Sequence, residues 1–125
     1  MPDKTKVLVI DDDPAICVSV KAILEASGYE TATALSGKEG LELFRRLNPD
    51  IVLCDMMMED IDAGAKVAKV IKEERPELPV FLLSTIGEAT ARTIGLDELG
   101  FNGVFQKPVN FDLLLSVLEK HRKKA

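Results

Sequence analysis

The 125-residue sequence contains only two cysteines, one histidine and no tryptophan. Cys17 and Cys54 each lie within an apolar pattern, and neither has a second cysteine or a histidine at the spacing of a metal site. We therefore expect both to be small buried hydrophobic residues. His121 lies on a basic stretch close to the C-terminus, where we expect a solvated residue at a frayed helix end rather than a functional histidine.

Long apolar runs and an excess of positive charge are also missing. No run approaches the roughly 20 residues that a membrane-spanning helix needs, and the four apolar residues before Asp11 are too few for a signal peptide. We therefore expect a cytoplasmic location. The formal net charge is −5, whereas nonspecific nucleic-acid binding requires Lys and Arg to neutralise phosphates. Neither a membrane nor a nucleic acid is expected as a direct partner.

The remaining composition is that of a globular protein, with 46% hydrophobic and 30% charged residues. No repeat, linker or low-complexity stretch divides the chain. We expect a single domain over residues 1–125, because two independent cores of half this size would each need disulfides or metals.

Strand-like and helix-like segments alternate along the sequence. Short apolar runs predict strands at residues 6–10, 29–34, 50–54, 80–83 and 103–106. Cap residues and helical periodicity predict helices from Pro14 up to Gly28, from Ser36 to Asn48, over 63–75, over 88–99 and after Asn110. The last helix is expected to bury Leu113, Leu114, Val117 and Leu118.

This (βα)5 pattern predicts an α/β protein with a doubly wound, parallel, five-stranded sheet and right-handed crossovers. In the flavodoxin-like strand order 2-1-3-4-5, the first and third strands are neighbours. Ligands of such sheets bind beyond the carboxyl ends of the strands. The residues at those ends are therefore the candidates for a functional site.

Polar or ionisable side chains follow four of the five predicted strands: Asp11, Asp12 and Asp13 the first, Asp55 the third, Ser84 and Thr85 the fourth, and Lys107 the fifth. Asp13 is explained as a helix N-cap. Asp11, Asp12 and Asp55 are expected to converge, and one lysine cannot balance three carboxylates. Either their pKa values are raised or a cation is bound. Oxygen ligands without His or Cys favour magnesium or calcium, and few protein ligands favour magnesium.

The same residues suit phosphoryl transfer. A carboxylate can attack phosphorus to form an aspartyl-phosphate, and the protein must then position and neutralise the phosphoryl oxygens. Asp55 as acceptor, Asp11 and Asp12 with the metal, and Lys107 and Ser84 on the phosphoryl oxygens form a complete set.

The sequence resembles the receiver domain of bacterial response regulators, of the chemotaxis-regulator type, over essentially its whole length. The matching stretches are 7–14 (VLVIDDDP), 49–58 (PDIVLCDMMM), 79–84 (PVFLLS) and Lys107-Pro108. The resemblance implies that Asp55 is the phosphoacceptor, that Asp12 binds the metal directly and Asp11 through a water, and that Met57 adds its backbone carbonyl. It further implies that Lys107 contacts the phosphoryl group, that Ser84 is the switch hydroxyl, and that the Lys107–Pro108 peptide bond is cis.

By the same resemblance, the domain takes its phosphoryl group from a sensor histidine kinase or a histidine phosphotransfer protein and signals to a downstream effector. It is then no enzyme beyond magnesium-dependent self-phosphorylation and autodephosphorylation. Three positions depart from the family pattern. Glu59 replaces a usual proline, Thr85 replaces a common alanine and restricts access to the phosphoryl group, and Val104 replaces an aromatic switch residue.

Other protein classes fit less well. A phosphatase of the haloacid dehalogenase type also uses an Asp nucleophile, magnesium and a lysine, but Ala15 stands where that family has Thr or Val. A flavodoxin-like cofactor module needs a Ser-, Thr- or Gly-rich phosphate loop, which three carboxylates would oppose. A receiver-like docking module without phosphorylation stays open, although its usual mark is loss of the acceptor or the lysine.

Overall fold

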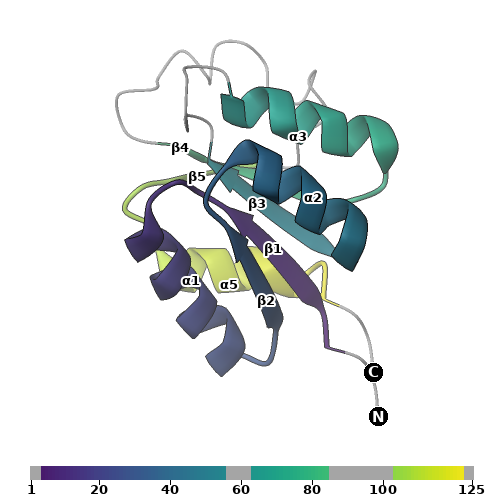
Figure 1. Ribbon diagram of the computed structural model, residues 1–125. Coiled ribbons are helices and arrows are strands. Elements are labelled where there is room, and N and C mark those ends of the chain that lie inside the picture. Colours follow the sequence, from purple (N-terminus) through teal and green to yellow (C-terminus); the bar gives the residue numbers. More distant parts are fainter. Residues whose placement is uncertain (1–3, 56–62, 85–102, 123–125) are drawn as a thin grey trace.

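The computed structural model describes residues 4–55, 63–84 and 103–122. Figure 1 shows a layered α/β structure built on one sheet of five parallel strands, in the order β2-β1-β3-β4-β5. The strands are β1 (Lys6–Ile10), β2 (Glu30–Ala34), β3 (Ile51–Asp55), β4 (Val80–Ser84) and β5 (Gly103–Gln106). The predicted fold class and strand order are confirmed.

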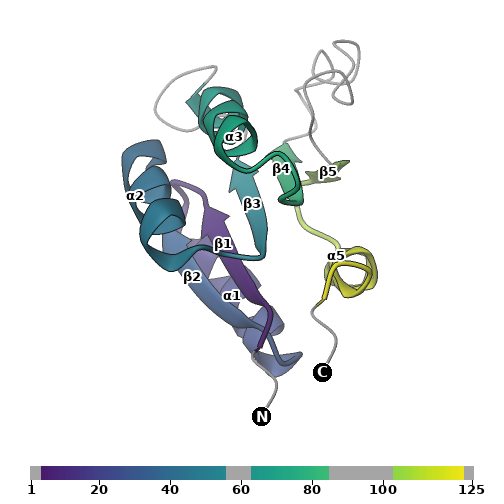
Figure 2. The ribbon, with the colours of Figure 1, turned by 90° about the vertical axis from the view of Figure 1, so that its right-hand side faces the viewer.

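Helices cover both faces of the sheet (Figure 2). The first face carries α1 (Pro14–Ala26) and α5 (Phe111–Glu119), and the second carries α2 (Gly37–Leu47) and α3 (Ala63–Glu74). Each face has its own cluster of buried side chains. Among the described residues, no helix is long and apolar enough to cross a membrane.

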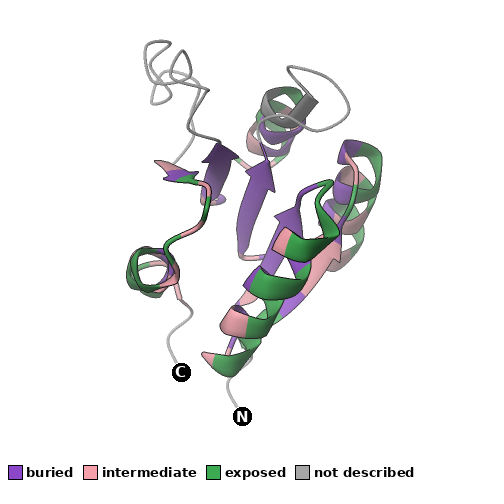
Figure 3. Ribbon diagram, turned by 90° about the vertical axis from the view of Figure 1, so that its left-hand side faces the viewer, coloured by how far each residue is buried: buried purple, intermediate pink, exposed green. Residues whose placement is uncertain are grey.

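Side chains along β1 alternate between these two clusters. Val7 and Val9 pack on the side of α1 and α5, whereas Leu8 and Ile10 pack on the side of α2. A parallel sheet covered on both faces buries its central strands completely, which explains their continuous apolar runs. Figure 3 shows this contrast, with buried central strands and helices that are exposed on their outer surfaces.

The helix ends follow the predicted signals. Asp13, Ser36 and Asn110 each cap a helix with a side-chain oxygen that accepts a backbone N–H two or three residues further on, at 2.9–3.1 Å. Gly28, with φ 95°, follows the end of α1, and Asn48 ends α2 in the left-handed conformation with φ 52°. These capping residues and left-handed turns fix where the helices begin and end.

The buried face of α5 differs from the predicted one at Leu113. Leu114 and Leu118 are fully buried and Val117 packs against the same cluster, but Leu113 is 52% exposed. Leu114 and Leu118 form the fully buried i, i+4 pair, and the partly buried Phe111, Leu115 and Val117 pack against the same cluster. The prediction that Leu113 belongs to the core is wrong.

The turn after α5 makes two aromatic contacts. His121 donates its N–H to the Leu118 carbonyl at 2.9 Å, and its ring packs edge-on against Phe81 of β4 with the centroids 5.5 Å apart. The Arg122 guanidinium lies 4.7 Å above the centre of the Tyr29 ring. His121 is therefore only partly exposed, and its contact with Phe81 holds a turn that was predicted to be frayed.

Several predictions concern residues outside the described ranges. These are the helix at 88–99, Met57, Glu59 and Thr85. They stay predictions.

Candidate functional site

Three carboxylates meet at the carboxyl edge of the sheet. Three carboxylate oxygens, one from each of Asp11, Asp12 and Asp55, lie within 4.8 Å of one another. Asp11 is fully buried and Asp55 is 3% exposed, whereas Asp12 is exposed. The three side chains that were predicted to converge are thus brought together by the neighbouring strands β1 and β3.

The turn after β1 is fixed by short hydrogen bonds. The Asp11 N–H donates to the Ala34 carbonyl at 3.0 Å, which extends the pairing of β1 with β2 by one residue. The Asp13 N–H donates to Asp11 Oδ1 at 2.9 Å, and Asp13 then caps α1. The acidic turn is therefore held between the end of a strand and the start of a helix.

Asp55 is the last residue of β3 rather than the residue after it. It pairs with Leu83 in the register of β3 and β4, so its main chain belongs to the sheet. The observed strand β3 is therefore displaced by one residue from the strand predicted at 50–54. The buried strand therefore fixes the main chain of Asp55, and only its side chain extends into the site.

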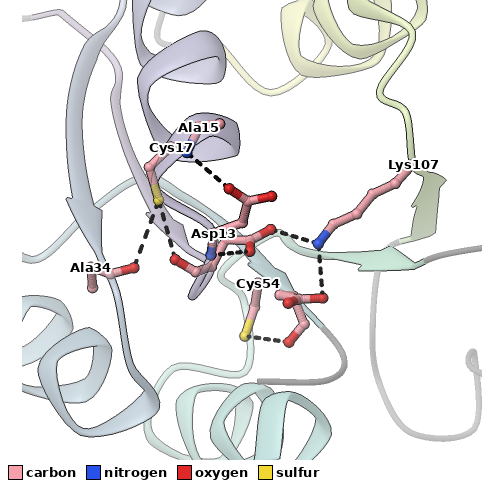
Figure 4. Close-up of polar contacts among 8 residues, drawn as sticks. Asp13, Ala15, Cys17, Ala34, Cys54 and Lys107 are labelled. Atoms are coloured by element: carbon pink, nitrogen blue, oxygen red, sulfur yellow. Dashed lines mark hydrogen bonds and ion pairs between the residues drawn. The ribbon is translucent and has the colours of Figure 1, made fainter. Parts of the chain in front are cut away.

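Lys107 links the two buried acids. Its Nζ lies 2.8 Å from Asp11 Oδ2 and 3.2 Å from Asp55 Oδ1 (Figure 4). Burial by itself lowers the pKa of this lysine, but the hydrogen bond to Asp11 and the charges of Asp11 and Asp55 outweigh burial, so the pKa is raised above its usual value. Lys107 is therefore positively charged at neutral pH.

The main chain around Lys107 is also fixed. The Lys107 N–H donates to the Ser84 carbonyl at 2.7 Å, and the Lys107–Pro108 peptide bond is cis, as the resemblance implied. Ser84 is the buried last residue of β4. Lys107 and Ser84 thus lie side by side at the carboxyl edge of the sheet, next to the end of β3.

The donor set fits a hard divalent cation. The group contains three carboxylates, and one lysine accompanies the two buried ones, so negative charge is in excess. All three donors are oxygens, which magnesium prefers. Met57, whose carbonyl was expected to complete the set, lies outside the described residues.

Comparison with known proteins identifies the family. The model of the response regulator receiver domain matches residues 7–119. The chain therefore belongs to this family and is the receiver domain of a two-component response regulator. This assignment does not favour the phosphatase alternative.

Curated relatives are longer proteins. The chain is 36% identical over 118 residues to the transcriptional regulatory protein ZraR of Escherichia coli (strain K12), which covers 94% of this chain and 26% of ZraR. It is 31% identical over 112 residues to the DNA-binding dual master transcriptional regulator RpaA of Synechocystis sp., covering 89% of this chain and 46% of RpaA. The chain thus spans about a quarter of ZraR.

Solved structures agree with the fold. A response regulator receiver domain protein from Clostridium thermocellum superposes with a TM-score of 0.85 at 31% identity, covering 94% of this chain and 93% of that one. A CheY-like receiver domain protein from Methanospirillum hungatei JF-1 gives a TM-score of 0.84 at 29% identity, covering 95% and 94%.

One residue beside the site was not predicted to contact it. Cys17 is buried as expected, but its Sγ also lies 3.3 Å from the carbonyl oxygen of Asp11. The sequence offered one signal: Cys17 is four residues after the N-cap Asp13, and its N–H donates to the Asp13 carbonyl, so it turns back toward the acidic segment.

Proposed function

We propose that this receiver domain accepts a phosphoryl group on Asp55 from the phosphohistidine of a sensor histidine kinase or a histidine phosphotransfer protein. The supporting observation is that one lysine ammonium group, Lys107 Nζ, contacts both Asp55 and Asp11. In the transfer, an Asp55 oxygen forms the new O–P bond as the N–P bond of the phosphohistidine breaks. The electron pair of that bond stays on the imidazole nitrogen, which takes up a proton.

Asp55 suits the role of acceptor better than Asp11. Asp11 Oδ1 accepts the Asp13 N–H, and Asp11 Oδ2 pairs with Lys107, so both of its oxygens are engaged in holding the site together. Asp12 is exposed at the rim, where it is suited to holding a cation. Asp55 lies at the end of the strand between β1 and β4, so neighbouring strands supply groups on both sides of it.

We assign Asp12, Asp55 and the Met57 backbone carbonyl as groups that would hold magnesium, with Asp11 holding it through a bound water. Bound magnesium supplies positive charge that neutralises phosphoryl oxygens. Lys107, which contacts Asp11 and Asp55, supplies further positive charge. Ser84 acts as the hydroxyl that donates to a phosphoryl oxygen, and Thr85 limits access to it.

The domain is a signalling switch rather than an enzyme that turns over a separate substrate. Its own chemistry is magnesium-dependent self-phosphorylation and autodephosphorylation. ZraR and RpaA carry names of transcriptional regulators and extend well beyond the matched region. The output of this receiver is therefore a downstream effector, whether joined to it or separate.

Incubation with acetyl phosphate and magnesium, followed by intact mass measurement, tests the proposal. We expect one phosphoryl adduct on the wild-type protein and none on Asp55→Asn. The matched control is Asp50→Asn, since Asp50 lies before β3 at the opposite edge of the sheet, where its Oδ2 accepts the Lys6 N–H at 2.8 Å. This control is expected to keep the adduct. An adduct of equal yield on Asp55→Asn would refute the assignment.

A further inference from the structure

The main-chain carbonyl of Asp11 lies one residue beyond the last paired residue of β1. The register of β1 with both neighbouring strands ends at Ile10. Asp11 itself is fully buried. A buried carbonyl beyond the ladder needs a donor from outside the sheet, because an unpaired one costs about as much as a lost hydrogen bond.

The thiol of Cys17 reaches this carbonyl from α1. Its Sγ lies 3.3 Å from the Asp11 oxygen and 3.9 Å from the Ala34 oxygen (Figure 4). A carbonyl can only accept, so the thiol must donate its proton, and the shorter distance favours Asp11. The Ala34 oxygen already accepts the Asp11 N–H.

We propose that Cys17 is a positioning residue for the metal site: its thiol proton, donated to the Asp11 carbonyl, fixes the peptide group that joins Asp11 to Asp12. This inference rests on the proposed magnesium-dependent function. The carbonyl of Asp11 and the N–H of Asp12 belong to one planar unit, so holding the oxygen also fixes where the main chain of Asp12 starts. Asp12 is exposed and lacks the packing that holds Asp11, which makes this restraint important for the direction of its carboxylate.

Cys54 provides an internal comparison. Its Sγ lies 3.5 Å from the Asp55 carbonyl, but that bond joins adjacent residues of one strand whose pairing already fixes the main chain. The contact of Cys17 instead joins α1 to the end of β1, across six positions of sequence. Only the contact of Cys17 restrains a carbonyl that lies beyond the last paired residue of its strand.

Three substitutions separate the hydrogen bond from simple packing. Cys17→Val keeps an apolar side chain and removes the donor, and Cys17→Ser keeps a donor. Val20→Ala is the control, because Val20 is buried in the same core cluster one turn further along α1. If Cys17→Val does not fold, Cys17→Ala takes its place.

Two measurements on the folded proteins test whether the Cys17 thiol positions the metal site. Calorimetric titration gives the magnesium dissociation constant, and NMR amide exchange without metal reports on the Asp12 and Asp13 N–H groups. We expect Cys17→Val to weaken magnesium binding by about 3- to 10-fold. Residues that orient a metal ligand without touching the metal typically contribute roughly 10- to 100-fold, and a smaller effect is expected here because a thiol is a weak donor. Exchange of both amides should also speed up. Cys17→Ser should stay within about twofold of wild type, and Val20→Ala should lose stability without losing affinity.

The outcomes keep the two proposals apart. Wild-type protein that binds no magnesium would contradict the proposed function, and the amide exchange would still decide the role of Cys17. Unchanged amide exchange in Cys17→Val would overturn the positioning role. So would an equal loss of affinity in Val20→Ala, since that would show a general effect of a weakened core.

Discussion

Lys107 Nζ lies 2.8 Å from Asp11 Oδ2 in an ion pair whose carboxylate is fully buried and whose lysine side chain is 15% exposed. The pair joins the end of β5 to the end of β1, across the two strands that separate them in the sheet. Lys107 also contacts Asp55, so one cation compensates two buried negative charges. Its removal therefore takes one positive charge away from both buried acids.

Lys107→Met is expected to lower the free energy of unfolding of the metal-free protein by roughly 3 kcal/mol, because breaking a buried pair leaves uncompensated charge. Magnesium should recover part of this loss by supplying positive charge. Urea unfolding with and without magnesium measures both effects. Lys6→Met is the control. Its ion pair with Glu30 is longer, at 3.6 Å, and more exposed, so a loss below about 1 kcal/mol is expected. Equal losses in the two variants would contradict this account.

The same ion pair predicts a pH dependence. The pKa of Lys107 is raised above its ordinary value of 10.5, so the folded protein retains this proton to higher pH than the unfolded chain does. The stabilisation is then complete below about pH 10.5 and is lost as pH rises through the folded-state pKa. The stability difference between wild type and Lys107→Met should stay constant from about pH 7 to 9 and shrink at higher pH. A difference that grew above about pH 10.5 would have the wrong sign.

Gly40→Ala is expected to destabilise the protein although alanine favours helices. A Cβ at Gly40, in the first turn of α2, would lie 2.6–2.9 Å from three side-chain carbons of Ile10, at the end of β1. Overpacking of this kind costs about 1–3 kcal/mol, more than the roughly 1 kcal/mol gained in helix propensity. Thermal unfolding measures the difference. Adding Ile10→Val removes the nearest carbon and should recover part of the loss, whereas strictly additive effects would show that the two residues do not interact.

Thr31→Val is expected to stabilise the protein by about 1 kcal/mol. The Thr31 hydroxyl oxygen is buried and has no hydrogen-bond partner within the part of the chain that the structure describes. Valine keeps the shape and the β-branched side chain while removing this polar atom. Thr33→Val, two residues along the same strand and only half-buried, is the control and should change stability little. A loss of stability in Thr31→Val would show that the hydroxyl is satisfied.

Both thiols are expected to resist modification in the folded protein. Burial, with a contribution from the charge of Asp11, raises the pKa of the Cys17 thiol to about 11, so little thiolate forms at neutral pH. Cys54 is also buried. Titration with a thiol-reactive disulfide reagent at pH 8 should proceed only at the rate of unfolding and should reach two thiols in urea. Rapid reaction of either thiol in the native protein would contradict the burial described for that cysteine.

Much of the fold and of the site follows from the sequence for a physical reason. Buried parallel strands need continuous apolar runs, and the acids come directly after or at the end of two such runs, so sheet order alone brings Asp11 and Asp55 together. Tertiary packing decides the rest. Leu113 continues the apolar pattern of α5, yet it is 52% exposed, because the packing of the helix and not its residue pattern decides which side is buried. The spacing of Cys17 from the N-cap Asp13 places its thiol near the acidic turn, but which carbonyl it reaches depends on how α1 packs in the folded protein.

Chemical mapping of the phosphorylated residue tests the central claim most directly. The protein is phosphorylated by a histidine kinase or by acetyl phosphate in the presence of magnesium. Borohydride then reduces any aspartyl-phosphate to homoserine, and peptide fragmentation locates the altered residue. The account predicts homoserine at position 55 and no other phosphorylated residue. Homoserine at Asp11, Asp12 or Asp13, or a stable phosphate on a serine or threonine, would contradict it.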